Sequence, residues 1–224
     1  MAMIGRAARL ILICHAETRA IRAGAFPTDD EALNAGGRRA AAALRERLPT
    51  VSRVLAGPAR AARETADALG LSPRIEPALR DADFGRWAGL SLSAVAAREP
   101  EALGRWRVEP DQAPHGGEPV TALCGRIGDW LDTGQIAGRT LAVTHAAVVR
   151  AAVVHVLGAR LDAFWRIDAG PLTMVEFTRH GRVWNLHVGQ LFLRGFFDDP
   201  AMCDLRAQGA GRPKREALTE DSKR

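Results

Sequence analysis

The stretch RLILICHAET, from Arg9 to Thr18, is an apolar run that stops abruptly at a histidine. A run of this length without charge predicts a strand buried on both faces, as in the centre of an α/β sheet. The carboxyl end of such a strand faces the crevice where α/β proteins bind ligands. His15 is therefore a candidate nucleophile or proton carrier. Taken alone, a histidine at a strand end is more often bonded to a neighbouring carbonyl, so the rest of the chain has to decide between these readings.

The composition fits one sizeable domain, because the chain has 224 residues and 47% of them are hydrophobic. The formal charge of +5, from 31 basic and 26 acidic residues, does not predict a nucleic-acid interface. Such an interface needs clustered basic residues, and here arginines are scattered, with the densest basic run at residues 211–215. The surplus of positive charge fits compositional bias and an anionic ligand better.

The cysteines, Cys14, Cys124 and Cys203, are widely spaced and form no CxxC pair. This spacing argues against a disulfide framework and against structural zinc. The apolar stretch near the N-terminus is too short for a signal peptide or a membrane span. We therefore expect a cytoplasmic protein without a membrane partner.

Strands and helices are predicted to alternate along the chain, which favours an α/β three-layer sandwich: a mostly parallel sheet flanked by helices, with a C-terminal antiparallel hairpin. After the opening strand, strands are expected at 51–56, 74–76, 139–144, 172–177 and 183–188, and helices at 38–48, 59–69, 91–98, 101–106, 120–131 and 146–157. Residues 19–34 are expected to form a loop over the site. We predict one domain over residues 1–199, with an inserted loop and helix region at about 79–118, and a polar, poorly ordered tail at 200–224.

Two strands of the predicted sheet end in histidine, at His15 and His145. Parallel strands deliver their carboxyl ends to one edge of a sheet, so both imidazoles can meet in one crevice. The acidic loop around Asp81 and Asp83 offers a carboxyl group as a proton donor. Helix N-termini beside such a site would suit an anion.

Several motifs in this order resemble the histidine phosphatase superfamily, also called phosphoglycerate mutase-like. The opening stretch resembles its Arg-His-Gly motif followed by Glu-Thr. Residues 30–41 resemble its Asp-x-Pro-Leu-Thr segment, and residues 57–66 resemble Ser-Pro-Leu-x-Arg-Ala-x-Gln-Thr-Ala. Residues 79–89, 116–118 and 143–150 resemble Leu-x-Glu-x-x-Phe-Gly-x-Trp-Glu-Gly, Gly-Gly-Glu and Val-x-His-Gly-Gly-x-x-Arg.

The resemblance implies a phosphohistidine mechanism that needs neither a metal nor another cofactor. In that mechanism His15 attacks phosphorus, the carboxyl group of Asp81 protonates the leaving oxygen, and His145 holds phosphoryl oxygens together with two arginines. A nucleophilic imidazole splits one displacement into two easier steps. The implied partner is a small phosphorylated or anionic metabolite, whose identity is set by the variable region at about 91–114. A homodimer is left open.

This chain departs from the pattern at both arginines, because Cys14 and Ala61 occupy their positions. Losing one preorganised oxyanion donor costs on the order of 10² to 10³ in rate. Candidate replacements and substrate-binding residues are Thr18, Arg19 and Arg22 after the first histidine, Arg60 and Arg63 beside Ala61, and Ala146 after the second histidine.

Three other readings stay open. The same crevice could serve a catalytically silent pseudoenzyme, or a ligand-binding or interaction protein. The spacing from Cys14 to Arg19 is one residue short of the Cys-x5-Arg loop of cysteine phosphatases. Cys14, His15, His145 and Asp81 have the ligand types of a zinc site, although their spacing does not require one.

Overall fold

Residues 8–133 and 136–188 are described by a computed structural model. They lie within one compact unit. The predictions for residues 200–224, for the basic run and for Cys203 lie outside the described residues. The domain boundary at residue 199 stays a prediction.

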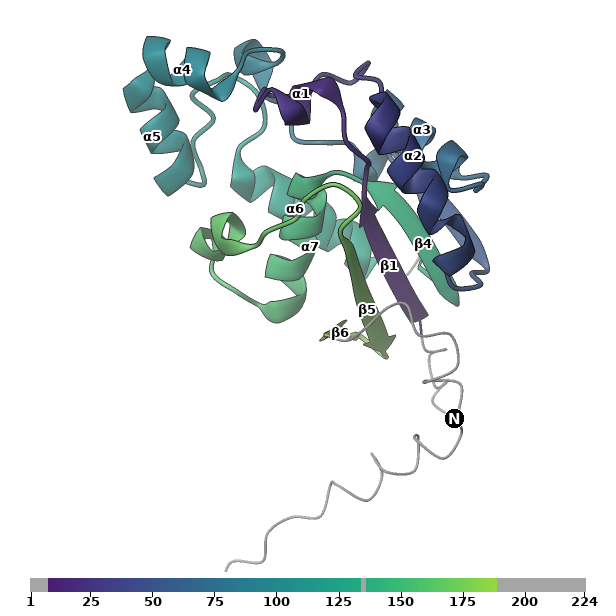
Figure 1. Ribbon diagram of the computed structural model, residues 1–224. Coiled ribbons are helices and arrows are strands. Elements are labelled where there is room, and N and C mark those ends of the chain that lie inside the picture. Colours follow the sequence, from purple (N-terminus) through teal and green to yellow (C-terminus); the bar gives the residue numbers. More distant parts are fainter. Residues whose placement is uncertain (1–7, 134–135, 189–224) are drawn as a thin grey trace, which may run out of the picture. The chain divides into compact units, whose positions relative to one another are not determined.

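A six-stranded mixed sheet forms the middle layer, in the order β3-β2-β4-β1-β5-β6. β1 is at its centre, parallel to β4 and antiparallel to β5 (Figure 1). The last two strands form the expected antiparallel hairpin. The strands are β1 (Ala8–Cys14), β2 (Arg53–Ala56), β3 (Arg74–Ile75), β4 (Arg139–Thr144), β5 (Met174–His180) and β6 (Val183–His187).

Helices cover both faces of the sheet, so the predicted three-layer α/β sandwich is confirmed. α2 and α3 lie on one face, and α6 and α7 lie on the other (Figure 1). The α-helices are α1 (Arg19–Arg22), α2 (Ala35–Leu44), α3 (Arg60–Ala68), α4 (Leu92–Arg98), α5 (Pro100–Val108), α6 (Val120–Asp132) and α7 (Ala146–Leu157). Short 3-10 helices occupy Arg45–Arg47, Pro77–Leu79, Gly85–Trp87 and Leu161–Arg166.

The apolar run of β1 fills two cores because successive side chains of a strand point to opposite faces. Leu10 and Leu12 belong to the core that includes α6 and α7 residues. Ile11 and Ile13 belong to the core that includes α2 and α3 residues. Burying each of these side chains stabilises the fold by roughly 1.5–3 kcal/mol. The alternation turns Cys14 toward the α6 and α7 side.

The prediction of a loop over residues 19–34 is wrong at its start. Residues 19–22 form α1, and the hydroxyl oxygen of Thr18 caps it by accepting a hydrogen bond from the backbone N–H of Ile21 (3.2 Å). A four-residue helix is too short to show a hydrophobic period. The next helix begins earlier than predicted, at Ala35, with Asn34 as its N-cap, and gives way to a 3-10 turn after Leu44.

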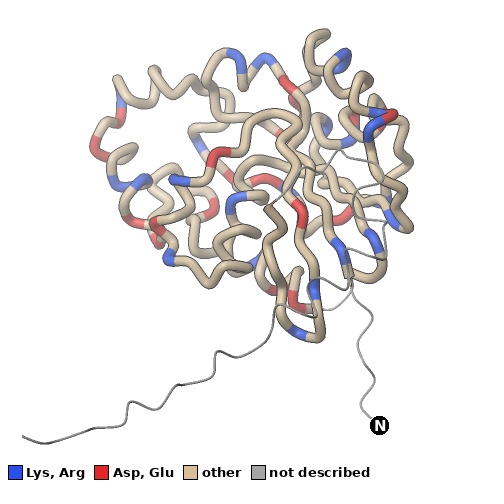
Figure 2. Tube along the Cα trace, turned by 60° about the horizontal axis from the view of Figure 1, so that its bottom comes forward, with Lys and Arg blue, Asp and Glu red and all other residues tan. Residues whose placement is uncertain are grey.

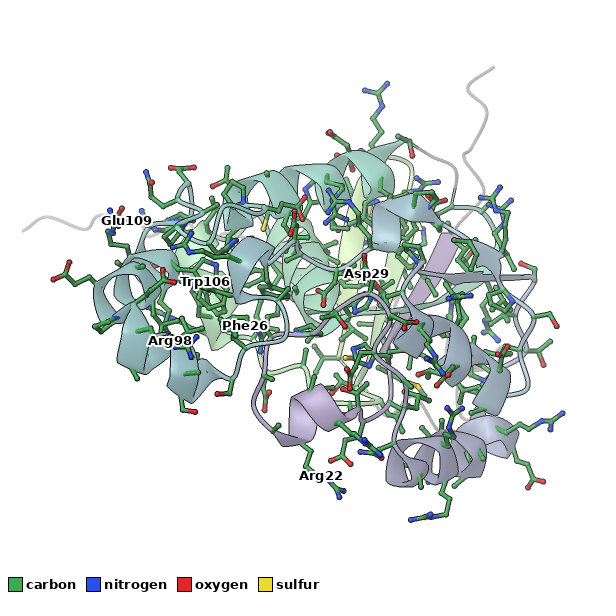
Figure 3. All side chains as sticks on the ribbon, turned by 90° about the horizontal axis from the view of Figure 1, so that it is seen from above. Arg22, Phe26, Asp29, Arg98, Trp106 and Glu109 are labelled. Carbon is green, nitrogen blue, oxygen red and sulfur yellow. The ribbon has the colours of Figure 1, made fainter. Side chains whose placement is uncertain are left out.

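The inserted region carries a small aromatic core of its own. Trp87 is fully buried, and Phe26 lies 5.4 Å from it between ring centroids. Trp106 on α5 completes the group, and Figure 3 shows it beside Phe26. α4 and α5 stand apart from the sheet in Figure 1. The backbone N–H of Phe26 donates to the carbonyl of Leu90, so the segment after β1 is tied to the insertion.

Candidate active site at the carboxyl ends of β1 and β4

His15 and His145 follow β1 and β4, which pair in register up to Cys14 and Thr144. The backbone N–H of His15 donates to the carbonyl of Thr144 (2.8 Å), which extends the ladder by one residue. The two imidazole rings lie 5.0 Å apart between centroids at an interplanar angle of 68°. Both side chains are buried. The structure therefore brings the two sequence-predicted histidines together.

The ring of His15 is held in one orientation. Its Nδ1 lies 2.9 Å from the carbonyl oxygen of Ala16 and must carry the proton, since a carbonyl only accepts. This leaves the lone pair on Nε2. Burial lowers the pKa of His15 to about 4 and the charge of His145 adds to the effect, while the Ala16 contact and Asp81 partly oppose it. The ring is therefore neutral at physiological pH, the form that a nucleophile requires.

The turn that follows His15 is fixed from α3. The backbone N–H of Ala16 donates to the hydroxyl of Thr65 (3.0 Å), and that hydroxyl donates to the carbonyl of Ala61 (2.7 Å). On the other side, the backbone N–H of Leu172 donates to the carbonyl of Cys14 (3.1 Å). His15 thus stands on a rigid support.

Asp81 lies beside His145, with 3.2 Å between carboxylate Oδ2 and ring Nδ1. The distance is that of an ion pair, yet among the described residues neither ring nitrogen of His145 has a partner with hydrogen-bond geometry. Burial raises the pKa of Asp81, but the charge and contact of His145 outweigh it, so the pKa is lowered overall. Asp81 is therefore ionised in the free protein. All three predicted catalytic residues occupy one site.

A partly buried ion-pair cluster holds the backbone next to Asp81. Glu118 accepts two hydrogen bonds from Arg80 (3.1 and 3.0 Å) and two from Arg126 (3.0 and 2.7 Å). Arg126 also donates to the carbonyls of Ala78 (2.6 Å), Arg80 (3.2 Å) and Asp81 (3.4 Å). None of these three charged residues is predicted from the sequence as part of the site, although Glu118 closes the Gly-Gly-Glu turn.

Cys14 is an unreactive thiol at this site. Its side chain is buried, and burial raises its pKa to about 12, with the charge of Asp81 acting in the same direction. The thiolate that a cysteine phosphatase needs is therefore nearly absent at neutral pH. Ala61, at the other expected arginine position, is also buried in α3.

The four arginines predicted as replacements lie toward the surface. Arg22 is ion-paired with Glu17 (2.8 Å) and points away from the protein in Figure 3. Arg60 is ion-paired with Glu64 (2.8 Å).

Arg19 and Arg63 are exposed. Within residues 8–133 and 136–188, none of the four arginines forms a hydrogen bond with His15 or His145. A hollow of about 360 Å³ includes Arg19 in its lining but none of the three catalytic candidates.

The remaining candidates differ in what they offer a ligand. The hydroxyl oxygen of Thr18 is already occupied, because it caps α1. Ala146 is the first residue of α7, whose N-terminus has no side-chain cap. Uncapped backbone N–H groups at a helix N-terminus bind anions. Ala146 can therefore contribute through its backbone.

Neither a metal cluster nor a membrane helix is found in the part of the chain that the structure describes. Its His, Cys, Asp and Glu side chains form no group of three or more with a metal-binding arrangement, and this includes Cys14, His15, His145 and Asp81. None of its helices is long and apolar enough to cross a membrane. Acidic and basic residues are interspersed along the described chain in Figure 2.

The sequence profile of the histidine phosphatase superfamily (branch 1) matches residues 10–189. The chain belongs to this family. The family resemblance inferred from the ordered motifs is thereby confirmed.

Phosphatases are among the proteins that this chain is similar to. A glucosyl-3-phosphoglycerate phosphatase of Mycobacterium tuberculosis is 33% identical over 130 residues, which are 54% of this chain and 57% of that protein. A protein of the same organism described as bifunctional is 28% identical over 190 residues, or 79% of this chain and 52% of that protein. The chain thus spans about half the length of the curated relatives it matches.

The fold is shared with solved phosphatase structures. The α-ribazole phosphatase of Shigella flexneri superposes with a TM-score of 0.72 at 22% identity, covering 83% of this chain and 98% of that one. At this identity the likeness concerns the fold alone.

Proposed function

We propose that the protein hydrolyses a small phosphomonoester through a phosphohistidine on His15. The observation that carries this proposal is the state of the His15 ring. Its Nδ1 proton is held by the Ala16 carbonyl at 2.9 Å, so the Nε2 lone pair is free and the ring is neutral above a pKa of about 4.

The reaction has two displacements at phosphorus. In the first, Nε2 of His15 forms a bond to phosphorus as the bond to the ester oxygen breaks, and the leaving alcohol takes a proton. In the second, water attacks phosphorus, the P–N bond breaks, and phosphate and neutral His15 are released. His145 lies against the same centre, where it can stabilise charge on the phosphoryl oxygens.

Asp81 is the proposed proton donor. Because its carboxyl group is ionised in the free protein, it must first take up a proton. A bound phosphate dianion disfavours a second negative charge nearby and raises the pKa of Asp81. The carboxyl group can therefore take up a proton as substrate binds and pass it to the leaving oxygen. In the second step the same carboxylate is placed to accept a proton from water.

A second candidate function is a catalytically silent binding protein that uses the same crevice for an anion. Cys14 and Ala61 favour it, because neither can hold the charge that develops on the phosphoryl oxygens. A cytoplasmic location and a homodimer remain predictions.

A panel of phosphomonoesters tests the proposal, with wild type, His15→Ala and His180→Ala compared. His180 is an exposed histidine at the end of β5 and serves as the matched control. We expect hydrolysis by wild type and His180→Ala, at least a hundredfold loss in His15→Ala, and acid-labile phosphate trapped on the active protein. Absence of turnover from wild type would support the silent binding protein instead. Turnover that is equal in His15→Ala would refute the proposed phosphohistidine on His15.

A further inference from the structure

We propose that Arg150 is an anion-binding residue of this site and supplies a guanidinium that positions 14 and 61 lack. The inference deepens the proposed function but does not require turnover, because a silent binding protein would hold its anion with the same residue.

The position of Arg150 on α7 directs its side chain toward the site. It lies five residues after His145, within the second turn of the helix. Side chains on a helix lean toward its N-terminus, and one turn rises about 5.4 Å. Ala146 and Ala147, one turn earlier, leave space for a long side chain to pass. A guanidinium at this position is therefore carried back toward the uncapped start of α7.

Arg150 is fixed in place without a counter-charge. Its Nε donates to the carbonyl of Ile167 (2.9 Å), and its guanidinium carbon lies 5.9 Å and 6.0 Å from the ring centroids of Phe164 and Trp165. Among the described residues no carboxylate pairs with it, and its two terminal nitrogens make no hydrogen bond. In contrast, Arg126 is ion-paired with Glu118. Terminal nitrogens of Arg150 are thus available to a ligand.

A cavity of about 60 Å³ includes Arg150 in its lining. Ala82 and Ala147 line the same cavity, next to Asp81 and two residues after His145, respectively. Since a buried water needs roughly 10–15 Å³, this space can hold a few waters or a small anion. The other charged residue in the lining, Glu118, is already neutralised by two arginines.

The positive charge of Arg150 acts on the carboxyl end of β1, which His15 follows. Cys14 points to the α7 side of the sheet, and Ala146 and Ala147 pack against the same core. The charge of Arg150 lowers the pKa of the Cys14 thiol, against the larger opposite effect of burial. An anion on His15 would lie within the same field.

Binding of inorganic phosphate tests the inference by calorimetry on the whole chain, with Arg150→Met, Arg150→Lys and Arg179→Met compared. Arg179 is a matched control at the opposite end of the sheet. It donates to the carbonyl of Ile136 (2.8 Å) and stacks 5.1 Å from the Trp184 ring centroid, so it repeats the contacts of Arg150 away from the site.

We expect Arg150→Met to weaken phosphate binding roughly 10- to 100-fold, which corresponds to one charge-assisted hydrogen bond. Arg150→Lys keeps the charge and should lose less, and Arg179→Met should bind as wild type does. Thermal unfolding of each variant separates a binding defect from misfolding, and Arg150→Gln replaces Arg150→Met if the latter does not fold.

Phosphate binding that is absent from wild type, unchanged in a folded Arg150 variant, or equally weakened in Arg179→Met would overturn the inference. Binding that depends on Arg150 in a protein without His15-dependent turnover would uphold it and count against hydrolysis alone. A fourth variant, Arg22→Met, tests the alternative, and loss of binding in it but not in Arg150→Met would assign the role to Arg22 of α1.

Discussion

Acid should destabilise this protein through His15. Burial lowers the pKa of this ring from 6.5 to about 4, so the folded protein resists protonation that the unfolded chain accepts. The shift of about 2.5 pKa units corresponds to about 3 kcal/mol of unfolding free energy at 1.36 kcal/mol per unit. A His15→Gln variant lacks this linkage.

The sign follows from the proton count. Above pH 6.5 neither state binds the proton, and the full contribution to stability is present. Between pH 6.5 and about 4 the unfolded state binds it and the folded state does not, so stability falls as the pH falls. Below about pH 4 both states are protonated and the loss is complete.

Urea unfolding at about pH 7.5 and about pH 5 measures the effect. Between these values wild type should lose about 2 kcal/mol more than His15→Gln, while other groups titrate in both proteins. His180→Gln, which removes an exposed histidine, should behave as wild type. The same pH slope in wild type and His15→Gln would refute the depressed pKa and with it the argument for a neutral nucleophile.

Three substitutions probe the supports of the site. Glu118→Gln should cost about 3 kcal/mol in urea unfolding because it leaves the partly buried Arg126 without a counter-charge. In an active enzyme it should slow hydrolysis of alkyl phosphates more than of aryl phosphates, which need less protonation. Trp87→Ala should cost about 3–5 kcal/mol in the same assay, since Trp87 is fully buried. Gly37→Ala should cost about 1–3 kcal/mol by thermal unfolding, because its Cβ would lie 2.3 Å from the carbonyl oxygen of Glu17. Stability equal to wild type would contradict each account.

The sheet could be predicted because its signals are local. The apolar runs of β1 and β4 are short, uncharged and closed by histidine, and parallel pairing then places His15 beside His145. α1 was missed because it has four residues and is defined by the Thr18 cap rather than by a hydrophobic period.

The sequence predicts only some of the interactions that the arginines make. The ion pair between Arg60 and Glu64 is spaced i,i+4 on a helix and was readable from the sequence. The cluster around Glu118 joins side chains to carbonyls of a segment distant in sequence. The role proposed for Arg150 depends on the absence of a carboxylate partner among the described residues. Neither leaves a pattern in the linear chain.

The high pKa of Cys14 also determines how slowly this thiol reacts with oxidants. Peroxides and electrophiles react with thiolates, and a thiol with a pKa of about 12 is almost entirely protonated at neutral pH. Cys124 is similar, with a pKa raised to about 11 by burial. Where a cysteine phosphatase is switched off by oxidation of its nucleophile, a site built on His15 beside an inert sulfur has no such switch.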